Sequence, residues 1–229
     1  EINQQLIHAA LAHQRTVHCV ADTAMSLVLN VMRQFPQSEN WLRSGKWLSA
    51  PSYPLTAALG GKTLGILGLG RIGEAIAKRA QAFGMKIAYH NRNRKNVPHT
   101  YYPDPVSLAG HCDVLLVAAP GGAETRNIVN AKVLDALGPR GFVVNIARGT
   151  LIDEPVLLEY LQQKKIAGAG LDVFVNEPGV PPGFFALENA VIYPHVGSAT
   201  VETRTAMGDL QLENLRLHFA GKPVKTRVV

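Results

Sequence analysis

Three glycines in the pattern Gly-x-Gly-x-x-Gly lie between an apolar segment and a segment with helical periodicity. The first glycine permits a tight turn, the second lets the backbone approach a pyrophosphate, and the third lets a helix pack closely on a strand. The anion then meets the backbone amides at the helix N-terminus. The spacing predicts a dinucleotide-binding turn, and a glycine-rich surface turn is the alternative. The residues expected to contact the cofactor here are Gly68, Leu69, Gly70, Arg71, Ile72 and Gly73.

The segment that follows the next predicted strand indicates which dinucleotide is bound. A site for NAD usually carries Asp or Glu about 20 residues after the glycines, where it binds the ribose 2′-hydroxyl. Here the segment reads His-Asn-Arg-Asn-Arg and has no acid. A guanidinium binds phosphate through charge-assisted hydrogen bonds, so Arg92 is predicted to bind a 2′-phosphate. NADP(H) is therefore the preferred cofactor and NAD(H) the alternative; a solvated basic loop is the alternative for Arg94 and Lys95. The residues expected at this end of the cofactor are Asn91, Arg92, Asn93 and Arg94.

Strand and helix patterns alternate along the chain, which predicts an α/β fold with a doubly wound parallel sheet. Strands are expected at residues 63–67, 86–89, 113–117, 142–146, 166–173 and 191–193. Helices are expected at 20–32, from 72 to 83, at 130–137, from 153 to about 163, and at 200–219. Asp153 as N-cap and Pro155 in the first turn explain the sequence Asp153-Glu154-Pro155 structurally. In such a sheet the ligand crevice lies at the carboxyl ends of the strands.

The segment from Asn40 to Leu59 contains both tryptophans, Trp41 and Trp47, and shows no clear periodicity. It is expected to form an ordered loop or arm after a helix that ends at Phe35-Pro36. Exposed tryptophans in an arm indicate a partner surface. The alternative, in which both rings cover the core, has equal support.

Composition and charge narrow the class of protein. The chain has 229 residues, is 47% hydrophobic and carries a net charge of +6. Its basic residues are scattered apart from the cluster already described, so no nucleic-acid partner is expected. No apolar run approaches membrane-spanning length, so a cytoplasmic protein without a membrane partner is expected. Cys19 and Cys112 are expected to be reduced thiols. No metal site is expected, because the spacing of His8, His13 and His18 rotates them off a common helix face.

Five motifs in this order resemble those of the D-isomer-specific 2-hydroxyacid dehydrogenase family, from the helix at Ala21 to the C-terminus. They are Gly68-Leu69-Gly70-Arg71-Ile72-Gly73, Asn145-Ile146-Ala147-Arg148-Gly149, Gly170-Leu171-Asp172-Val173-Phe174, Asn176-Glu177-Pro178 and Pro194-His195-Val196-Gly197-Ser198. Within the family, the closest likeness is to the NADP-dependent glyoxylate/hydroxypyruvate reductases. The resemblance implies a Rossmann-like NAD(P)-binding domain. It also implies reduction of glyoxylate or hydroxypyruvate, each a small 2-oxo acid, to the D-2-hydroxy acid.

The resemblance further implies that Arg148, Glu177 and His195 are the catalytic residues, with Asp172 near the nicotinamide. The chemistry of these three side chains agrees with a catalytic role. Histidine can donate a proton near neutral pH, and a neighbouring carboxylate favours its charged form, which fits His195 as general acid and Glu177 as its partner. A guanidinium binds a carboxylate through two parallel hydrogen bonds, which fits Arg148 as the anchor of the substrate. Taken singly, each residue also has an ordinary structural role as its alternative. The remaining residues expected to contact the cofactor are Pro120, Ile146 and Gly197.

The sequence departs from the family before Ala21, where members carry a substrate domain of roughly a hundred residues. Residues 20–199 are therefore expected to form the dinucleotide-binding domain, and residues 1–19 and 200–229 a remnant of the substrate domain. Without that domain to pack against, the C-terminal helix would expose part of its apolar surface, at Leu212, Leu215 and Phe219. Two interpretations stand. One is an NADPH-dependent reductase that dimerises through the dinucleotide-binding domain and the Trp41–Trp47 arm. The other is a truncated or non-catalytic NAD(P)-binding module, or a corepressor-like sensor, without a complete substrate site.

Overall fold

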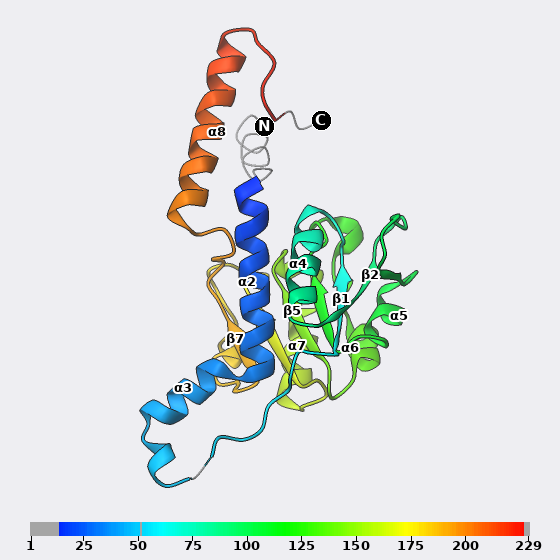
Figure 1. Ribbon diagram of the computed structural model, residues 1–229, viewed down its shortest axis with the longest axis vertical. Helices are drawn as coiled ribbons and strands as arrows, with labels where there is room; N and C mark the ends of the chain where they lie inside the picture. Colours follow the sequence, from blue (N-terminus) through cyan, green and yellow to red (C-terminus); the bar gives the residue numbers. More distant parts are fainter. Residues whose placement is uncertain (1–13, 51, 227–229) are drawn as a thin grey trace.

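The computed structural model describes residues 14–50 and 52–226. His8, His13 and most of the predicted remnant at residues 1–19 lie outside the described residues. The described chain folds around a seven-stranded sheet in the order β3-β2-β1-β4-β5-β6-β7, and every pair of neighbouring strands is parallel. The prediction of a doubly wound parallel sheet is confirmed (Figure 1).

Six of the strands follow the predicted order, and their ends differ from the prediction by a few residues. The short strand at residues 100–101 and the short helix at residues 105–109 were not predicted. They are β1 (Thr63–Leu67), β2 (Lys86–His90), β3 (Thr100–Tyr101), β4 (Val114–Val117), β5 (Phe142–Asn145), β6 (Gly168–Leu171) and β7 (Ala190–Ile192). The α-helices are α2 (Gln14–Arg33), α3 (Phe35–Arg43), α4 (Arg71–Ala82), α5 (Pro105–Ala109), α6 (Ala131–Leu137), α7 (Glu154–Gln162) and α8 (Val201–Phe219). The 3-10 turns are η1 (Lys46–Leu48), η2 (Ala123–Thr125), η3 (Gly149–Leu151) and η4 (Pro182–Phe184).

Helices cover both faces of the sheet, which explains why the central strands read as continuous apolar runs. On one face, Leu64, Ile66 and Leu116 pack with α2 and α4. On the other face, Leu115 and Val117 pack with α5, α6 and α7. Successive strand residues therefore enter opposite halves of the core.

The helix predicted at residues 20–32 is longer in the structure, where α2 runs from Gln14 to Arg33. It lies across β5, β6 and β7 and against α4. The close approach depends on glycine in β6, because a Cβ at Gly170 would lie 3.1 Å from the Cβ of Leu27.

Phe35-Pro36 ends α2, as predicted, but it also opens a further helix. Gln34 adopts a left-handed conformation (φ 52°) between the two helices, and α3 continues to Arg43. The prediction that residues from Asn40 onward form a loop is wrong for α3 and η1. The nine residues of α3 include only three large apolar side chains, Phe35, Trp41 and Leu42, and none of its residues is buried, so its apolar pattern is too short to indicate a helix.

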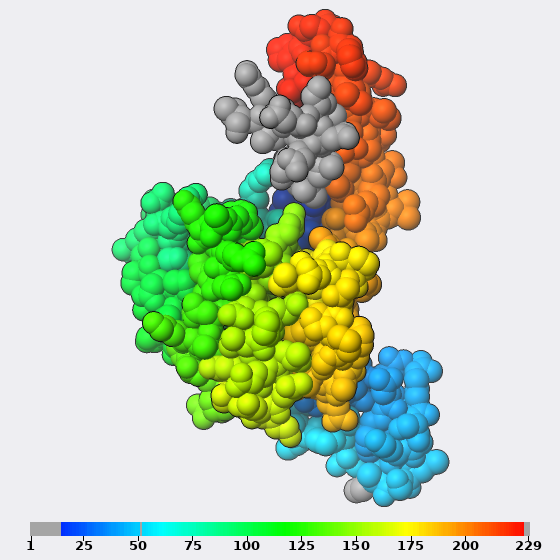
Figure 2. Space-filling model, turned by 180° about the vertical axis from the view of Figure 1, so that it is seen from behind, coloured from blue at the N-terminus to red at the C-terminus, as the bar shows by residue number. Residues whose placement is uncertain are grey.

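The arm built by α3 and η1 projects from the sheet domain, at the opposite end from α8 (Figure 1, Figure 2). The ring of Trp41 contacts that of Tyr53 edge-on, with centroids 5.7 Å apart, and Trp47 is 59% exposed. Neither tryptophan belongs to a core cluster, so the alternative in which both rings cover the core is wrong. As expected, Leu212 and Phe219 of α8 are exposed, whereas Leu215 is half-buried.

The first turns of α8 and α7 differ in how they are capped. The hydroxyl of Thr200 accepts a hydrogen bond from the backbone amide of Thr203, so Thr200 caps α8. Asp153 occupies the N-cap position of α7 but makes no side-chain capping bond, so the predicted cap is wrong in that respect. None of the helices in residues 14–50 and 52–226 combines the length and the apolar character that a membrane span requires.

Candidate active site

The glycine turn joins β1 to α4 in the predicted way. Gly68 has a φ of 104°, which only glycine adopts without strain, and a Cβ there would lie 2.5 Å from the amide nitrogen of Ala119. At Gly73 a Cβ would lie 2.6 Å from the carbonyl oxygen of Gly68, so this glycine permits the close packing of helix on strand. At Gly70 a Cβ would meet no atom within 4 Å. The open space at Gly70, beside the N-terminus of α4, fits a pyrophosphate that approaches the backbone.

The residues between the glycines have different environments. Leu69 is fully buried, and its backbone amide donates to the side-chain oxygen of Asn91, 2.7 Å away. The side-chain nitrogen of Asn91 donates in turn to the Leu69 carbonyl at 3.3 Å. Asn91 therefore fixes the glycine turn to the end of β2, a role that the sequence did not indicate. Ile72 packs against the core, and Arg71 is exposed on α4.

The basic segment after β2 is exposed at Arg92, Asn93 and Arg94. The guanidinium of Arg92 contacts the Glu124 carboxylate at 3.1 Å. The guanidinium of Arg94 lies over the ring of Tyr101, 6.0 Å from its centroid. Positive charge is thus displayed beside the glycine turn, where the adenosine end of a dinucleotide lies in folds of this kind.

A buried asparagine shapes the turn that presents Arg148. Asn145 ends β5 with 1% of its surface exposed. Its side-chain nitrogen donates to the Arg148 carbonyl at 2.9 Å, and its oxygen accepts from the Ala147 amide at 3.0 Å. Arg148 is exposed, and its guanidinium donates to the Ala147 carbonyl at 2.6 Å. The neighbouring Ile146 is 7% exposed and packs in the core, so little of it remains for a cofactor.

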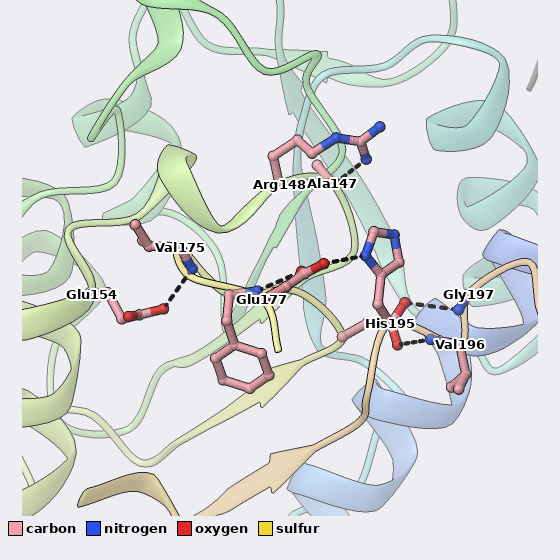
Figure 3. Close-up of polar contacts among 10 residues, drawn as sticks. Ala147, Arg148, Glu154, Val175, Glu177, His195, Val196 and Gly197 are labelled. Atoms are coloured by element: carbon pink, nitrogen blue, oxygen red, sulfur yellow. Dashed lines mark hydrogen bonds and ion pairs between the residues drawn. The ribbon is translucent and has the colours of Figure 1, made fainter. Parts of the chain in front are cut away.

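Glu177 and His195 form a direct pair. Nδ1 of His195 lies 2.6 Å from Oε2 of Glu177, and Oε1 of Glu177 accepts from the backbone amide of Phe174 at 2.9 Å (Figure 3). Partial burial raises the pKa of Glu177, but hydrogen bonds from His195 and Phe174 outweigh it and hold this pKa below its usual value. The carboxylate is therefore charged at neutral pH. Because Nδ1 faces Glu177, Nε2 is the ring nitrogen left for a substrate.

Asp172 holds the turn that carries His195. Its two carboxylate oxygens accept from the amides of Val196 and Gly197, both at 2.8 Å. His195 has a φ of 53°, a left-handed conformation that the surrounding bonds must maintain. A Cβ at Gly197 would lie 2.8 Å from the Asp172 carboxylate, so glycine is required there. Burial raises the pKa of Asp172 despite the two backbone hydrogen bonds.

A second carboxylate supports the loop that contains Glu177. Glu154, the first residue of α7, accepts a hydrogen bond from the backbone amide of Val175 at 3.0 Å (Figure 3). A Cβ at Gly149 would lie 2.0 Å from the carbonyl carbon of Phe174, so the turn after β5 contacts the loop after β6 through backbone atoms. The sequence did not indicate this role of Glu154, since its partner lies 21 residues away.

The three predicted catalytic residues converge at the carboxyl edge of the sheet. Arg148 follows β5, Glu177 lies in the loop after β6, and His195 follows β7, three adjacent strands. In Figure 3 the Arg148 side chain extends on the same side as the His195 ring. A Cβ at Gly121, after β4, would lie 2.9 Å from Cγ of Arg148, so Arg148 also borders the loop that begins at Pro120. Among the described residues, no group of three or more metal-ligating side chains is placed to hold a metal ion.

Comparison with known proteins agrees with this geometry. Residues 25–197 match the D-isomer specific 2-hydroxyacid dehydrogenase family, NAD binding domain. Hydroxyphenylpyruvate reductase of Plectranthus scutellarioides and glyoxylate/hydroxypyruvate reductase A of Arabidopsis thaliana are each 49% identical over 211 residues. Each alignment covers 92% of this chain and 67% of the relative.

A solved structure shares the fold as well as the sequence. The NADPH-dependent glyoxylate/hydroxypyruvate reductase of Sinorhizobium meliloti, in complex with NADP and malonate, is 47% identical, with a TM-score of 0.91. The match covers 95% of this chain and 69% of that chain, so this chain spans about two thirds of the length of its relatives. The chain belongs to the D-isomer specific 2-hydroxyacid dehydrogenase family of NAD(P)-dependent oxidoreductases, and its resemblance to the glyoxylate/hydroxypyruvate reductases is confirmed.

Proposed function

We propose that this protein reduces a small 2-oxo acid, glyoxylate or hydroxypyruvate, to the D-2-hydroxy acid with NADPH. The observation that carries the proposal is the 2.6 Å contact between His195 and Glu177, next to Arg148 at the edge of the sheet that bears the glycine turn. A proton donor and a carboxylate anchor are what reduction of a 2-oxo acid requires from the protein.

Each residue has one step in this mechanism. Bound NADPH supplies a hydride for the carbonyl carbon. Arg148 binds the substrate carboxylate through its guanidinium and orients the carbonyl. Nε2 of His195 donates a proton to the carbonyl oxygen as the C–H bond forms, so this oxygen becomes a neutral hydroxyl group. Glu177 holds Nδ1 and stabilises the charged imidazole before the transfer.

A turnover assay tests the reaction. NADPH oxidation, followed by its loss of nicotinamide absorbance, should depend on added glyoxylate or hydroxypyruvate and should saturate with either acid. The competing function is a nucleotide-binding module without a complete substrate site. Tight binding of NADPH with no substrate-dependent oxidation would favour that module and contradict the reductase.

The choice of NADPH is supported by Arg92 and by the NADP complex of the Sinorhizobium relative. We expect NADPH to bind about 10- to 100-fold more tightly than NADH, the range that hydrogen bonds to a charged group contribute. Arg92→Ala should remove most of this difference while leaving NADH binding nearly unchanged. Dissociation constants from nicotinamide fluorescence check both expectations. Equal affinities in the unsubstituted protein would contradict the assignment.

A homodimer belongs to the same proposal, with the dinucleotide-binding domain and the arm at Trp41–Trp47 as its interface. It is supported by large apolar side chains that the arm exposes, among them Trp47 at 59% and Leu48 at 96%. Apolar and aromatic side chains of this kind are enriched in the cores of interfaces. Light scattering should give twice the chain mass at micromolar concentration. Leu48→Glu should shift the protein towards the monomer, and a monomer without the substitution would refute the proposal.

A further inference from the structure

One ion pair joins two loops on either side of the glycine turn. The Arg92 guanidinium lies 3.1 Å from the Glu124 carboxylate. Arg92 follows β2, whereas Glu124 lies in η2, which follows β4. In the sheet, β1 lies between β2 and β4 and leads directly into Gly68. The pair therefore spans the strand that carries the dinucleotide turn.

The loop that carries Glu124 has its own hydrogen bonds. The hydroxyl of Thr125 donates to the Pro120 carbonyl at 2.8 Å and lies 3.3 Å from the Gly122 carbonyl. The backbone amide of Thr125 donates to the same Gly122 carbonyl at 3.2 Å. The backbone at Glu124 is thus held by a closed turn whose hydrogen bonds do not involve Arg92.

The other cations of the basic segment have different partners. Lys95 lies 2.6 Å from the Glu74 carboxylate on α4, and Arg94 lies over the Tyr101 ring. The side chains of Arg92 and Glu124 are 85% and 80% exposed, so water and salt screen their attraction. A phosphate with nearly two negative charges can therefore displace the carboxylate from Arg92, but it must do so against the charge of Glu124.

We propose that Glu124 is a specificity-determining residue that competes with the cofactor 2′-phosphate for Arg92. It lowers the affinity for NADPH and leaves the affinity for NADH unchanged, because NADH presents no phosphate there. The inference rests on the proposed role of Arg92. Accordingly, a residue on the β4 side of the site sets how strongly NADPH is preferred over NADH.

Glu124→Gln tests this inference through binding alone. We expect NADPH to bind about two- to fivefold more tightly, the range that one exposed ion pair contributes, with NADH binding unchanged. The gain should shrink at high salt because the interaction is screened. Glu159→Gln is the matched control: it removes the same charge from another exposed ion pair, with Lys165 at 3.4 Å, and should change neither affinity.

A double substitution that includes Arg92→Ala separates competition for Arg92 from direct repulsion between Glu124 and the cofactor phosphate. Glu124→Gln should give little gain there, since no guanidinium remains to be released. An equal gain with and without Arg92, an equal gain for NADH, or no gain at all would overturn the inference. If Arg92→Ala weakens NADPH binding and Glu124→Gln has no effect, only the inference fails. If Arg92→Ala has no effect on NADPH binding, the proposed cofactor assignment fails as well.

Discussion

Replacing His195 with alanine is expected to lower kcat for 2-oxo acid reduction by about 10²- to 10⁴-fold, the range that general acid catalysis contributes. The imidazole is the proton donor of the proposed reaction, and its 2.6 Å contact with Glu177 is the only hydrogen bond of its ring among those identified in the described residues. Its removal therefore takes away the proton without breaking a core contact. Stopped-flow or steady-state measurement of NADPH oxidation gives the rate.

Two controls accompany this substitution. NADPH should bind His195→Ala with an affinity within a few-fold of that of the unsubstituted protein, because the glycine turn and Arg92 are unchanged. His218→Ala removes an exposed histidine from α8 and should leave kcat unaltered. A loss of kcat below about tenfold for His195→Ala would refute the proton-donor role.

Arg148→Lys is expected to reduce kcat/KM by about 10- to 100-fold, the range for a lost charge-assisted hydrogen bond. Lysine keeps the positive charge but cannot form two parallel hydrogen bonds with a planar carboxylate. Since Arg148 anchors and orients the substrate, both a higher KM and a lower kcat are expected. Initial rates over a range of glyoxylate concentrations separate the two parameters.

The matched control for this change is Arg216→Lys, in the last turn of α8. It should leave kcat/KM unaltered, and the affinity of Arg148→Lys for NADPH should also stay the same. If Arg148→Lys retained full kcat/KM, charge alone would explain the role of this residue and the bidentate anchor would be wrong.

The sheet and the glycine turn could be predicted because their signals are local. Buried parallel strands are apolar on both faces, the backbone conformation at Gly68 requires glycine, and the close contact of Gly73 with the Gly68 carbonyl leaves no room for a Cβ. Helix α3 could not be found in the same way, since it has only nine residues, three of them large and apolar, and none of them is buried. The direction of its axis depends on a left-handed residue, Gln34, which carries no glycine signal.

The supporting contacts of the site were harder to predict than the residues that they support. Asn91, Asn145, Asp172 and Glu154 all bind backbone groups, and three of these partners lie more than 20 residues away in sequence. A bond from a side chain to a distant amide imposes no pattern on the residues between them. Only the fold brings such partners together, so these positioning roles came from the structure.

The most direct test of the proposed function is the configuration of the product formed from hydroxypyruvate and NADPH. Chiral chromatography should find D-glycerate in one-to-one proportion with the NADPH oxidised, and His195→Ala should slow the formation of both products by the same factor, about 10²- to 10⁴-fold. L-glycerate, or NADPH oxidised without glycerate, would contradict the assigned reaction. Binding of NADPH with neither oxidation nor product would show a nucleotide-binding module in place of a reductase.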